Sequence, residues 1–300
     1  MTADKLSSEY YLPAGATADG TCTVSITPES AGWRESSLWV IELAADEGIS
    51  LESEADEIIV VPLRGAASVS SGRQRYMLRG RKSVFDGPTD FAYVGIDSEF
   101  SIDTELGGRF ALLGARANRA LPFRYIPAED VAVELRGSGS CSRQVHNFAT
   151  PETFDADALI ACEVITPGGN WSSYPPHKHD ETSADEAELE EIYYFEIADS
   201  ATGTPGFGYH RVYGTDARPI DVTAEVRTGD TVLVPHGYHG PSIAAPGYDM
   251  YYLNVMAGPG PDRAWKITDD PAHAWIRETW PDTPVDARLP LPRRPRLEKS

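Results

Sequence analysis

The chain has 300 residues, of which 41% are hydrophobic and 24% charged, an ordinary balance for a globular protein with one large or two moderate domains. Its formal net charge of −20 argues against nucleic acid or an anionic membrane surface as a partner. No run of about 18 apolar residues and no signal peptide is recognisable, so we expect a cytoplasmic protein. Three widely spaced cysteines without a CxxC pair argue against a disulfide scaffold or a cysteine-based zinc site.

The first half of the chain consists of short segments rich in Val, Ile and Phe, separated by Gly, Pro and Asp. Short strands with regular turn signals are typical of an all-β sandwich or barrel. The predicted strands are residues 37–43, 57–61, 66–69, 83–85, 91–94 and 109–113. We therefore expect an N-terminal barrel over residues 1–134.

A Gly- and Ser-rich stretch beginning at residue 135 marks the predicted domain junction, and we assign residues 135–154 to an inter-domain segment. Residues 155–265 then repeat the β pattern and form the second predicted barrel. Its predicted strands are residues 159–166, 191–197, 207–213, 231–234 and 250–255. Residues 266–300 are predicted to hold a short helix near 271–280 and an extended Pro- and Arg-rich tail.

The histidines are distributed unevenly, because the first 145 residues contain none. His177 and His179 are two residues apart, so on a strand both rings lie on one face. His239 follows a Gly-Asp turn, an apolar strand and a proline. Imidazole is the commonest protein ligand for catalytic divalent metals, so we expect one metal site in the second half.

A carboxylate from the intervening strand completes the predicted ligand set. Glu190 and Glu191 are adjacent, and only one of them can face the barrel interior. We choose Glu191 because it shares a strand face with Tyr193 and Phe195. Three imidazole nitrogens and one carboxylate oxygen suit Zn, Mn, Fe or Ni, with Zn or Mn favoured.

This pattern of His, His, Glu and His resembles the two motifs of the cupin superfamily. Three blocks are more closely similar to the 5-deoxy-glucuronate isomerases of myo-inositol catabolism: residues 169–180 (GNWSSYPPHKHD), 191–194 (EIYY) and 247–258 (GYDMYYLNVMAG). The resemblance covers most of the chain and is densest in residues 134–258. It implies two tandem cupin (jelly-roll β-barrel) domains, with the metal held in the C-terminal one. The ligands carried over are His177, His179, Glu191 and His239.

The resemblance also implies an aldose–ketose isomerase that converts 5-deoxy-D-glucuronate to 5-dehydro-2-deoxy-D-gluconate. A proton shuttle between neighbouring carbons needs a general base. The candidates are a metal-bound hydroxide and four side chains, Tyr193, His210, Asp249 and Tyr251.

The sugar-acid substrate carries a carboxylate, which needs a basic partner. We expect Arg143 or Arg211 to bind it. Lys178 lies between two ligand histidines, so on a regular strand it points away from the metal.

Two other functions remain open from the sequence. A cupin dioxygenase would use the same ligands with redox iron. A non-catalytic sugar-acid-binding cupin would use the same fold without turnover, because function belongs to sites rather than to scaffolds. We also expect a homo-oligomer, since cupins often pair through sheets that continue across subunits.

Overall fold

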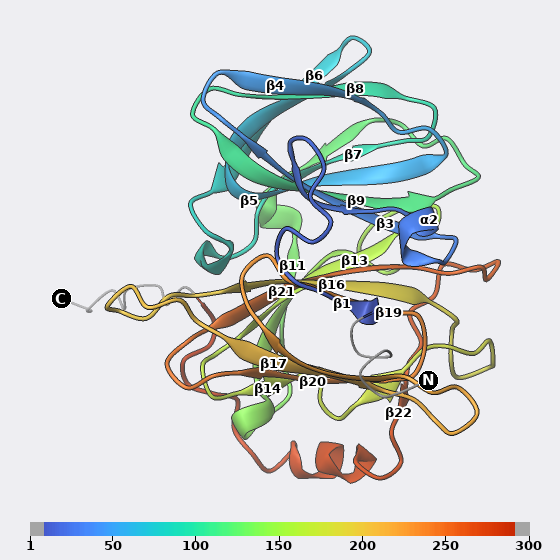
Figure 1. The fold of residues 1–300 in the computed structure, drawn as a ribbon, viewed down its shortest axis with the longest axis vertical. Coiled ribbons are helices and arrows are strands. Elements are labelled where there is room, and N and C mark those ends of the chain that lie inside the picture. The colour runs from blue at the N-terminus through green and yellow to red at the C-terminus, as the bar shows by residue number, and fades with distance from the viewer. Residues whose placement is uncertain (1–8, 292–300) are drawn as a thin grey trace.

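The computed structural model describes residues 9–291. Figure 1 shows two β-barrels stacked along the long axis, with the N-terminal barrel at the top and the C-terminal barrel below it. The predicted all-β architecture of two tandem barrels is confirmed. None of the helices between residues 9 and 291 has the length and apolarity needed to cross a bilayer.

The N-terminal barrel is one nine-stranded sheet with the order β10-β7-β5-β9-β3-β2, completed by β4, β6 and β8. Its strands are β2 (Cys22–Ile26), β3 (Ser36–Leu43), β4 (Glu47–Glu52), β5 (Asp56–Ser71), β6 (Gln74–Arg81), β7 (Phe91–Val94), β8 (Glu99–Thr104), β9 (Gly108–Arg116) and β10 (Arg124–Ile126). Its short helices are α2 (Pro28–Ala31), η1 (Val84–Asp86) and η2 (Ala128–Asp130).

Two details of this barrel differ from the prediction. Strand β5 joins the two predicted strands 57–61 and 66–69, because Pro62 and Gly65 form register shifts in a continuous strand rather than a turn. The predicted strand 83–85 is instead the 3₁₀ helix η1, whose N-terminus is capped by the Ser83 side chain accepting from the Phe85 N–H.

The C-terminal barrel pairs a seven-stranded sheet, β1-β19-β16-β21-β13-β12-β11, with a six-stranded sheet in which β18-β17-β20-β15-β22 is joined by β14. The strands of the first sheet are β1 (Tyr11–Leu12), β11 (Ala132–Arg136), β12 (Arg143–Ala149), β13 (Ile160–Thr166), β16 (Glu190–Ile197), β19 (Thr231–Val234) and β21 (Met250–Ala257). Those of the second are β14 (Trp171–Ser172), β15 (His177–Lys178), β17 (Gly208–Tyr213), β18 (Asp221–Val226), β20 (Tyr238–Ala244) and β22 (Thr268–Asp269).

The boundaries of the second barrel are wider than predicted. Residues 135–154 do not form a simple linker, because β12 and all of η3 (Gly139–Cys141) lie within them and β12 pairs with β11 and β13. Strand β1 also joins this barrel by pairing with β19. At the other end, β22 pairs with β15, and the predicted helix is the 3₁₀ helix η4 (Ala274–Thr279). The predicted tail lies outside the described residues from residue 292 onward.

The seven-stranded sheet is buried on both faces. One face packs against β3 and β9 of the N-terminal barrel and contributes Ile192, Tyr194 and Leu253 to the core between the barrels. The other face lines the inside of the C-terminal barrel with Tyr193 and Tyr252. Because side chains alternate along a strand, the register of β16 and β21 decides which residues reach the barrel interior.

Candidate active site

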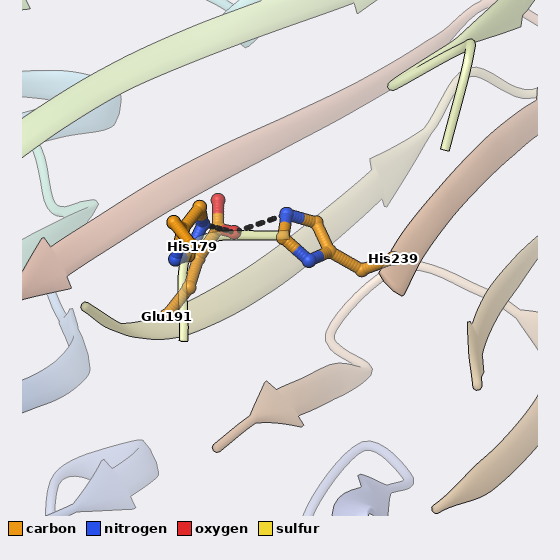
Figure 2. Close-up of side chains that lie close together, drawn as sticks. All are labelled: His179, Glu191 and His239. Atoms are coloured by element: carbon orange, nitrogen blue, oxygen red, sulfur yellow. Dashed lines mark hydrogen bonds and ion pairs between the residues drawn. The ribbon is translucent and has the colours of Figure 1, made fainter. Parts of the chain in front are cut away.

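Three of the four predicted ligands converge inside the C-terminal barrel (Figure 2). His179 follows β15, Glu191 lies near the start of β16, and His239 lies in β20. Nε2 of His179 and Nε2 of His239 each lie 3.0 Å from Oε2 of Glu191. All three side chains are buried. The residues that supply these atoms are far apart in sequence, and the barrel brings them within 4.8 Å of one another.

The fourth predicted ligand, His177, lies beside this group. Its Cα is paired with that of His239 across β15 and β20, and the two rings are 4.5 Å apart between centroids. Its ring is 6.4 Å from that of His179. Cross-strand partners face the same side of a sheet, so the His177 ring is directed to the same side as the ligand group without being part of its tight core.

Backbone carbonyls orient all three imidazoles in the same way. In each ring Nδ1 faces a carbonyl oxygen, which favours the tautomer with the proton on Nδ1 and leaves the Nε2 lone pair free. The carbonyls belong to Pro175 for His177, Leu189 for His179 and Gly237 for His239, at 3.3, 3.1 and 3.3 Å. Rings held in this manner present Nε2 as the ligand atom.

The Glu191 carboxylate is fixed from its other oxygen. Asn254 donates from Nδ2 to Oε1 at 2.6 Å, which leaves Oε2 for the histidines. Burial alone would raise the pKa of Glu191, but the neighbouring His239 and His179 imidazoles hold it well below its usual range. Burial alone would lower the pKa of His179, but the same carboxylate raises it.

The ligand group fits a divalent cation. Nε2 of His239 is buried and makes no hydrogen bond with the described residues, although Glu191 Oε2 is 3.0 Å away. A buried nitrogen without a partner is costly unless another group occupies its lone pair. One nitrogen or oxygen atom from each of His179, Glu191 and His239 lies within 4.8 Å of the others, close enough for all three to bind one ion. These residues could therefore hold a metal ion.

Two of the four predicted catalytic side chains lie beside this group. The Tyr193 ring is 6.0 Å from that of His239 and 4.4 Å from that of His210. The Tyr193 hydroxyl contacts Ser173 Oγ at 3.1 Å, and burial raises its pKa well above the usual value, so it stays protonated. His210 Nδ1 lies 2.8 Å from Ser242 Oγ, and its buried Nε2 has no hydrogen-bond partner in residues 9–291. Burial, and then the nearby His239, lower the pKa of His210 to about 3, so it is neutral at physiological pH.

The other two predicted catalytic residues are placed elsewhere. Tyr251 faces the core between the barrels, and its hydroxyl donates to Glu163 at 2.8 Å. Asp249 accepts from the backbone N–H of Gly168 at 2.8 Å and holds a turn before β21. The prediction of Tyr251 is corrected because it occupies the strand face opposite to Tyr252, which does point into the barrel.

The two predicted substrate-binding arginines are in opposite environments. Arg211 is exposed on the outer face of β17, over the ring of Tyr213, so the structure does not support it as a substrate ligand. Arg143 is 6% exposed, on the face of β12 that lines the barrel interior. Its Nη1 donates to the carbonyls of Cys141 and Tyr174, and none of the ion pairs within residues 9–291 includes it.

Several polar groups on and around β11 and β12 were not found from the sequence. Arg136 is the cross-strand partner of Arg143 and forms a two-point pair with Glu134. Asn147 Oδ1 and Trp265 Nε1 are buried without partners in the described chain. Arg136 could have been found from the register of the β11–β12 hairpin, because residues that are paired across a hairpin lie on the same face of the sheet.

A surface cavity of about 720 Å³ lies in another place, between the barrels, and is lined by Arg116, Asp157, Arg263 and Lys266 among others. None of the predicted ligands borders it. The buried ligand group is the stronger candidate for chemistry, because it combines convergent metal-ligating atoms with unpartnered polar atoms.

Comparison with known proteins identifies the family. The model of the KduI/IolB family matches residues 10–276. The chain belongs to this family. It is 42% identical to the 5-deoxy-glucuronate isomerase of Geobacillus kaustophilus over 91% of this chain and 96% of that protein. It is also 42% identical to the 5-deoxy-glucuronate isomerase of Bacillus subtilis strain 168, over 80% of this chain and 86% of that protein.

Solved structures agree with the fold expected for the KduI/IolB family. An IolB-like protein from Salmonella typhimurium LT2 matches with a TM-score of 0.82 at 36% identity, covering 89% of this chain and 99% of that one. The oxalate decarboxylase of Lactobacillus farciminis matches with a TM-score of 0.58 at 11% identity, covering 82% of each chain, which shows the fold alone. The predicted tandem cupin fold is confirmed.

Proposed function

We propose that this protein is a 5-deoxy-glucuronate isomerase that converts 5-deoxy-D-glucuronate to 5-dehydro-2-deoxy-D-gluconate in myo-inositol degradation. The observation that carries the proposal is the match to the Geobacillus kaustophilus isomerase over 96% of that protein's length. The reaction needs no external oxidant, because the hydrogen on C2 moves to C1 while the C2 hydroxyl becomes a carbonyl and the C1 aldehyde becomes an alcohol.

In this proposal His177, His179, Glu191 and His239 hold one divalent ion. When bound, the ion would supply Lewis-acid polarisation of the substrate oxygens. The donor set suits Zn, Mn, Fe or Ni. Zn and Mn are favoured among these, because the set combines imidazole nitrogens with a carboxylate oxygen. Metal analysis of protein purified without added metal tests this choice.

Arg143 is proposed to bind the substrate carboxylate. It is a buried guanidinium without an acidic partner among the described residues, and a carboxylate is the group that would satisfy its remaining N–H donors. Its neighbour Tyr174 leads directly to Ser173, whose hydroxyl contacts both Tyr193 and Tyr252. Polar groups therefore continue from the guanidinium toward the ligand group. Asn147 Oδ1 and Trp265 Nε1 are then available to the substrate hydroxyls.

Tyr193 and His210 are proposed to act on the reacting carbons. The protonated Tyr193 hydroxyl donates a hydrogen bond to the substrate oxygen on which negative charge develops. His210 donates from Nδ1 to Ser242 in the tautomer that leaves Nε2 as a free acceptor within the barrel. Nε2 takes the proton from C2, the protonated ring exchanges that proton with solvent, and Nε2 then delivers a proton to C1.

We also propose that the enzyme works in the cytoplasm as a homo-oligomer on a small sugar acid, without nucleic acid or membrane partners. The net charge of −20 supports the absence of anionic polymers and surfaces as partners. Sedimentation of the purified protein would give the number of subunits.

The test is NMR of the metal-loaded protein with 5-deoxy-D-glucuronate in heavy water. We expect the ketose product with deuterium at the former aldehyde carbon. Product without solvent deuterium would assign a hydride shift and remove the proton-carrier role from His210. Failure to form the ketose, or oxygen consumption in place of isomerisation, would overturn the proposed function and favour a dioxygenase or a non-catalytic binding protein.

A further inference from the structure

The two adjacent glutamates at the start of β16 face opposite sides of the sheet. Glu191 points into the C-terminal barrel and belongs to the ligand group. Glu190 points to the N-terminal barrel, where its carboxylate accepts three backbone N–H groups. These come from Arg34, Glu35 and Ser36, at 2.8, 2.9 and 3.0 Å. The Ser36 hydroxyl adds a longer contact at 3.4 Å.

The Glu190 contact lies at the point where β16 has a hydrogen-bonded neighbour on only one side. At Glu191 the strand is paired on both sides, with Val234 of β19 and Met256 of β21. At Glu190 it is paired only with Ala257 of β21. The strand therefore enters the sheet with backbone support on one side. The Glu190 carboxylate supplies the missing support through hydrogen bonds to N–H groups, which are stronger when the acceptor is charged.

The segment that donates these hydrogen bonds is itself rigid. Ser36 is the first residue of β3, fully buried, and β3 lies between β2 and β9 in the N-terminal sheet. The carboxylate is thus anchored to a central strand rather than to a loose loop. A ligand carboxylate one residue along the chain inherits that anchoring, because a displacement of Glu190 would shift the backbone of Glu191 with it.

We infer that Glu190 is a positioning residue for Glu191, and that the N-terminal barrel, which has no histidine before residue 146, takes part in metal binding through this contact. The inference rests on the proposed metal centre of the isomerase. It gives the barrel that lacks ligands a specific role, which is to fix the direction from which the Glu191 carboxylate enters the site.

The chain contains a matched control in which the direction of the contact is reversed: a glutamate of the N-terminal barrel accepts backbone N–H groups of the C-terminal barrel. Glu57 of β5 accepts the backbone N–H groups of three residues of the second barrel. These are Asp157, Ala158 and Leu159, at 2.9, 2.6 and 2.7 Å. The backbone contacts are of the same kind and also join the two barrels, and Glu57 in addition accepts a hydrogen bond from the Tyr93 hydroxyl at 2.6 Å. The segment it holds leads into β13, which carries none of the proposed ligands.

The experiment compares Glu190→Ala, Glu190→Gln and Glu57→Ala with wild-type protein. Co²⁺ is titrated against a competing chelator at a temperature at which circular dichroism shows each variant folded. The cobalt absorption bands report the coordination of the ion, and denaturant unfolding of the metal-free proteins reports stability. Altered partners of metal ligands typically cost roughly 10- to 100-fold in affinity.

We expect Glu190→Ala to bind Co²⁺ roughly tenfold more weakly than wild type and with altered absorption bands. Glu190→Gln keeps an acceptor oxygen without the charge, so its affinity should fall between the two. Glu57→Ala should lose at least as much stability while its Co²⁺ affinity and spectrum stay those of wild type.

Wild-type affinity and spectrum in folded Glu190→Ala would overturn the inference. An equal loss of affinity in Glu57→Ala would also overturn it, since the effect would then be general loosening of the barrels. If wild-type protein itself binds no divalent ion, the proposed metal centre fails, and that result is distinguishable from the failure of Glu190 alone.

Discussion

Replacing Arg143 by methionine should raise the free energy of unfolding of the substrate-free protein and strongly lower kcat/KM. The Arg143 side chain is buried, and desolvation lowers its pKa from 12.5 to about 10. At about 1.4 kcal/mol per pKa unit, the cost of burying this charge is on the order of 3 kcal/mol. Burial disfavours the charged form, so the cost is present at neutral pH, where Arg143 is charged in both folded and unfolded chains.

Methionine has similar length and no charge, so the Arg143→Met variant should recover part of that cost. We expect the free energy of unfolding to rise by about 1 to 3 kcal/mol. Catalysis should move in the other direction. Losing two charge-assisted hydrogen bonds to the substrate carboxylate, at about 1.5 kcal/mol or more each, lowers kcat/KM by at least about 10²-fold.

The control is Arg136→Met, at the cross-strand neighbour of Arg143. Arg136 bonds both oxygens of Glu134, at 3.0 and 2.7 Å, so its removal leaves a partly buried carboxylate without its partner and should destabilise the protein. Urea unfolding of the metal-free proteins and steady-state kinetics measure both effects. A less stable Arg143→Met variant would show that the guanidinium is satisfied without substrate, and an unchanged KM and kcat would refute its role.

Three further outcomes follow from the site and the barrel interface. Glu163 is buried between the barrels, and despite its burial the charge of Arg81 lowers its pKa from 4.5 to about 2. The stabilisation from ionised Glu163 is fully present above pH 4.5 and is lost as the pH falls through about 2. Glu163→Gln should therefore lower the free energy of unfolding in urea by about 3 to 5 kcal/mol at pH 7. The variant should also lack the part of the fall in that free energy between pH 4.5 and 2 that comes from protonation of Glu163. Tyr193→Phe should lower kcat on the order of 10²-fold, whereas Tyr251→Phe should leave kcat unchanged and only reduce stability; equal kinetic effects would contradict the opposite orientations of the two rings. His177→Ala should weaken metal binding roughly tenfold in a chelator competition, and no change would remove it from the ligand set.

The ligand group could be predicted because the sequence spacing of its residues determines on which face of a strand each side chain lies. A His-x-His pair and a glutamate that opens an apolar strand specify which faces they occupy once the strands are assigned. The choice of Glu191 over Glu190 rests on the shared face with Tyr193, and the structure places both on the barrel interior. Short strands bounded by glycine and proline were also predictable. Strand β19, for example, coincides with the predicted residues 231–234.

The boundaries of the barrels were less predictable, because pairing across long sequence distances defines them. Strand β1 has two residues, and its place in the C-terminal sheet depends on a partner strand, β19, that lies in the distant second half of the chain. The Gly- and Ser-rich stretch after residue 135 has the composition of a linker, yet it is the connection of the β11–β12 hairpin. Composition describes the local turn and says nothing about which sheet its flanking strands join.

The error at Tyr251 has a clear physical origin. In a sheet that is exposed on one face, alternation of polar and apolar residues shows which side chains point inward. The seven-stranded sheet is covered on both faces, by the barrel interior and by the N-terminal barrel, so β21 is buried at every position and its sequence is almost continuously apolar. Tyr251 and Tyr252 are then indistinguishable in composition, and only the register with β16 separates the ring that contacts Ser173 from the one that contacts Glu163. The same double burial makes the N-terminal barrel necessary: without it, Glu163 would lose its ion pair with Arg81, Glu190 would lose its three backbone N–H donors, and the apolar side chains of this face would be exposed.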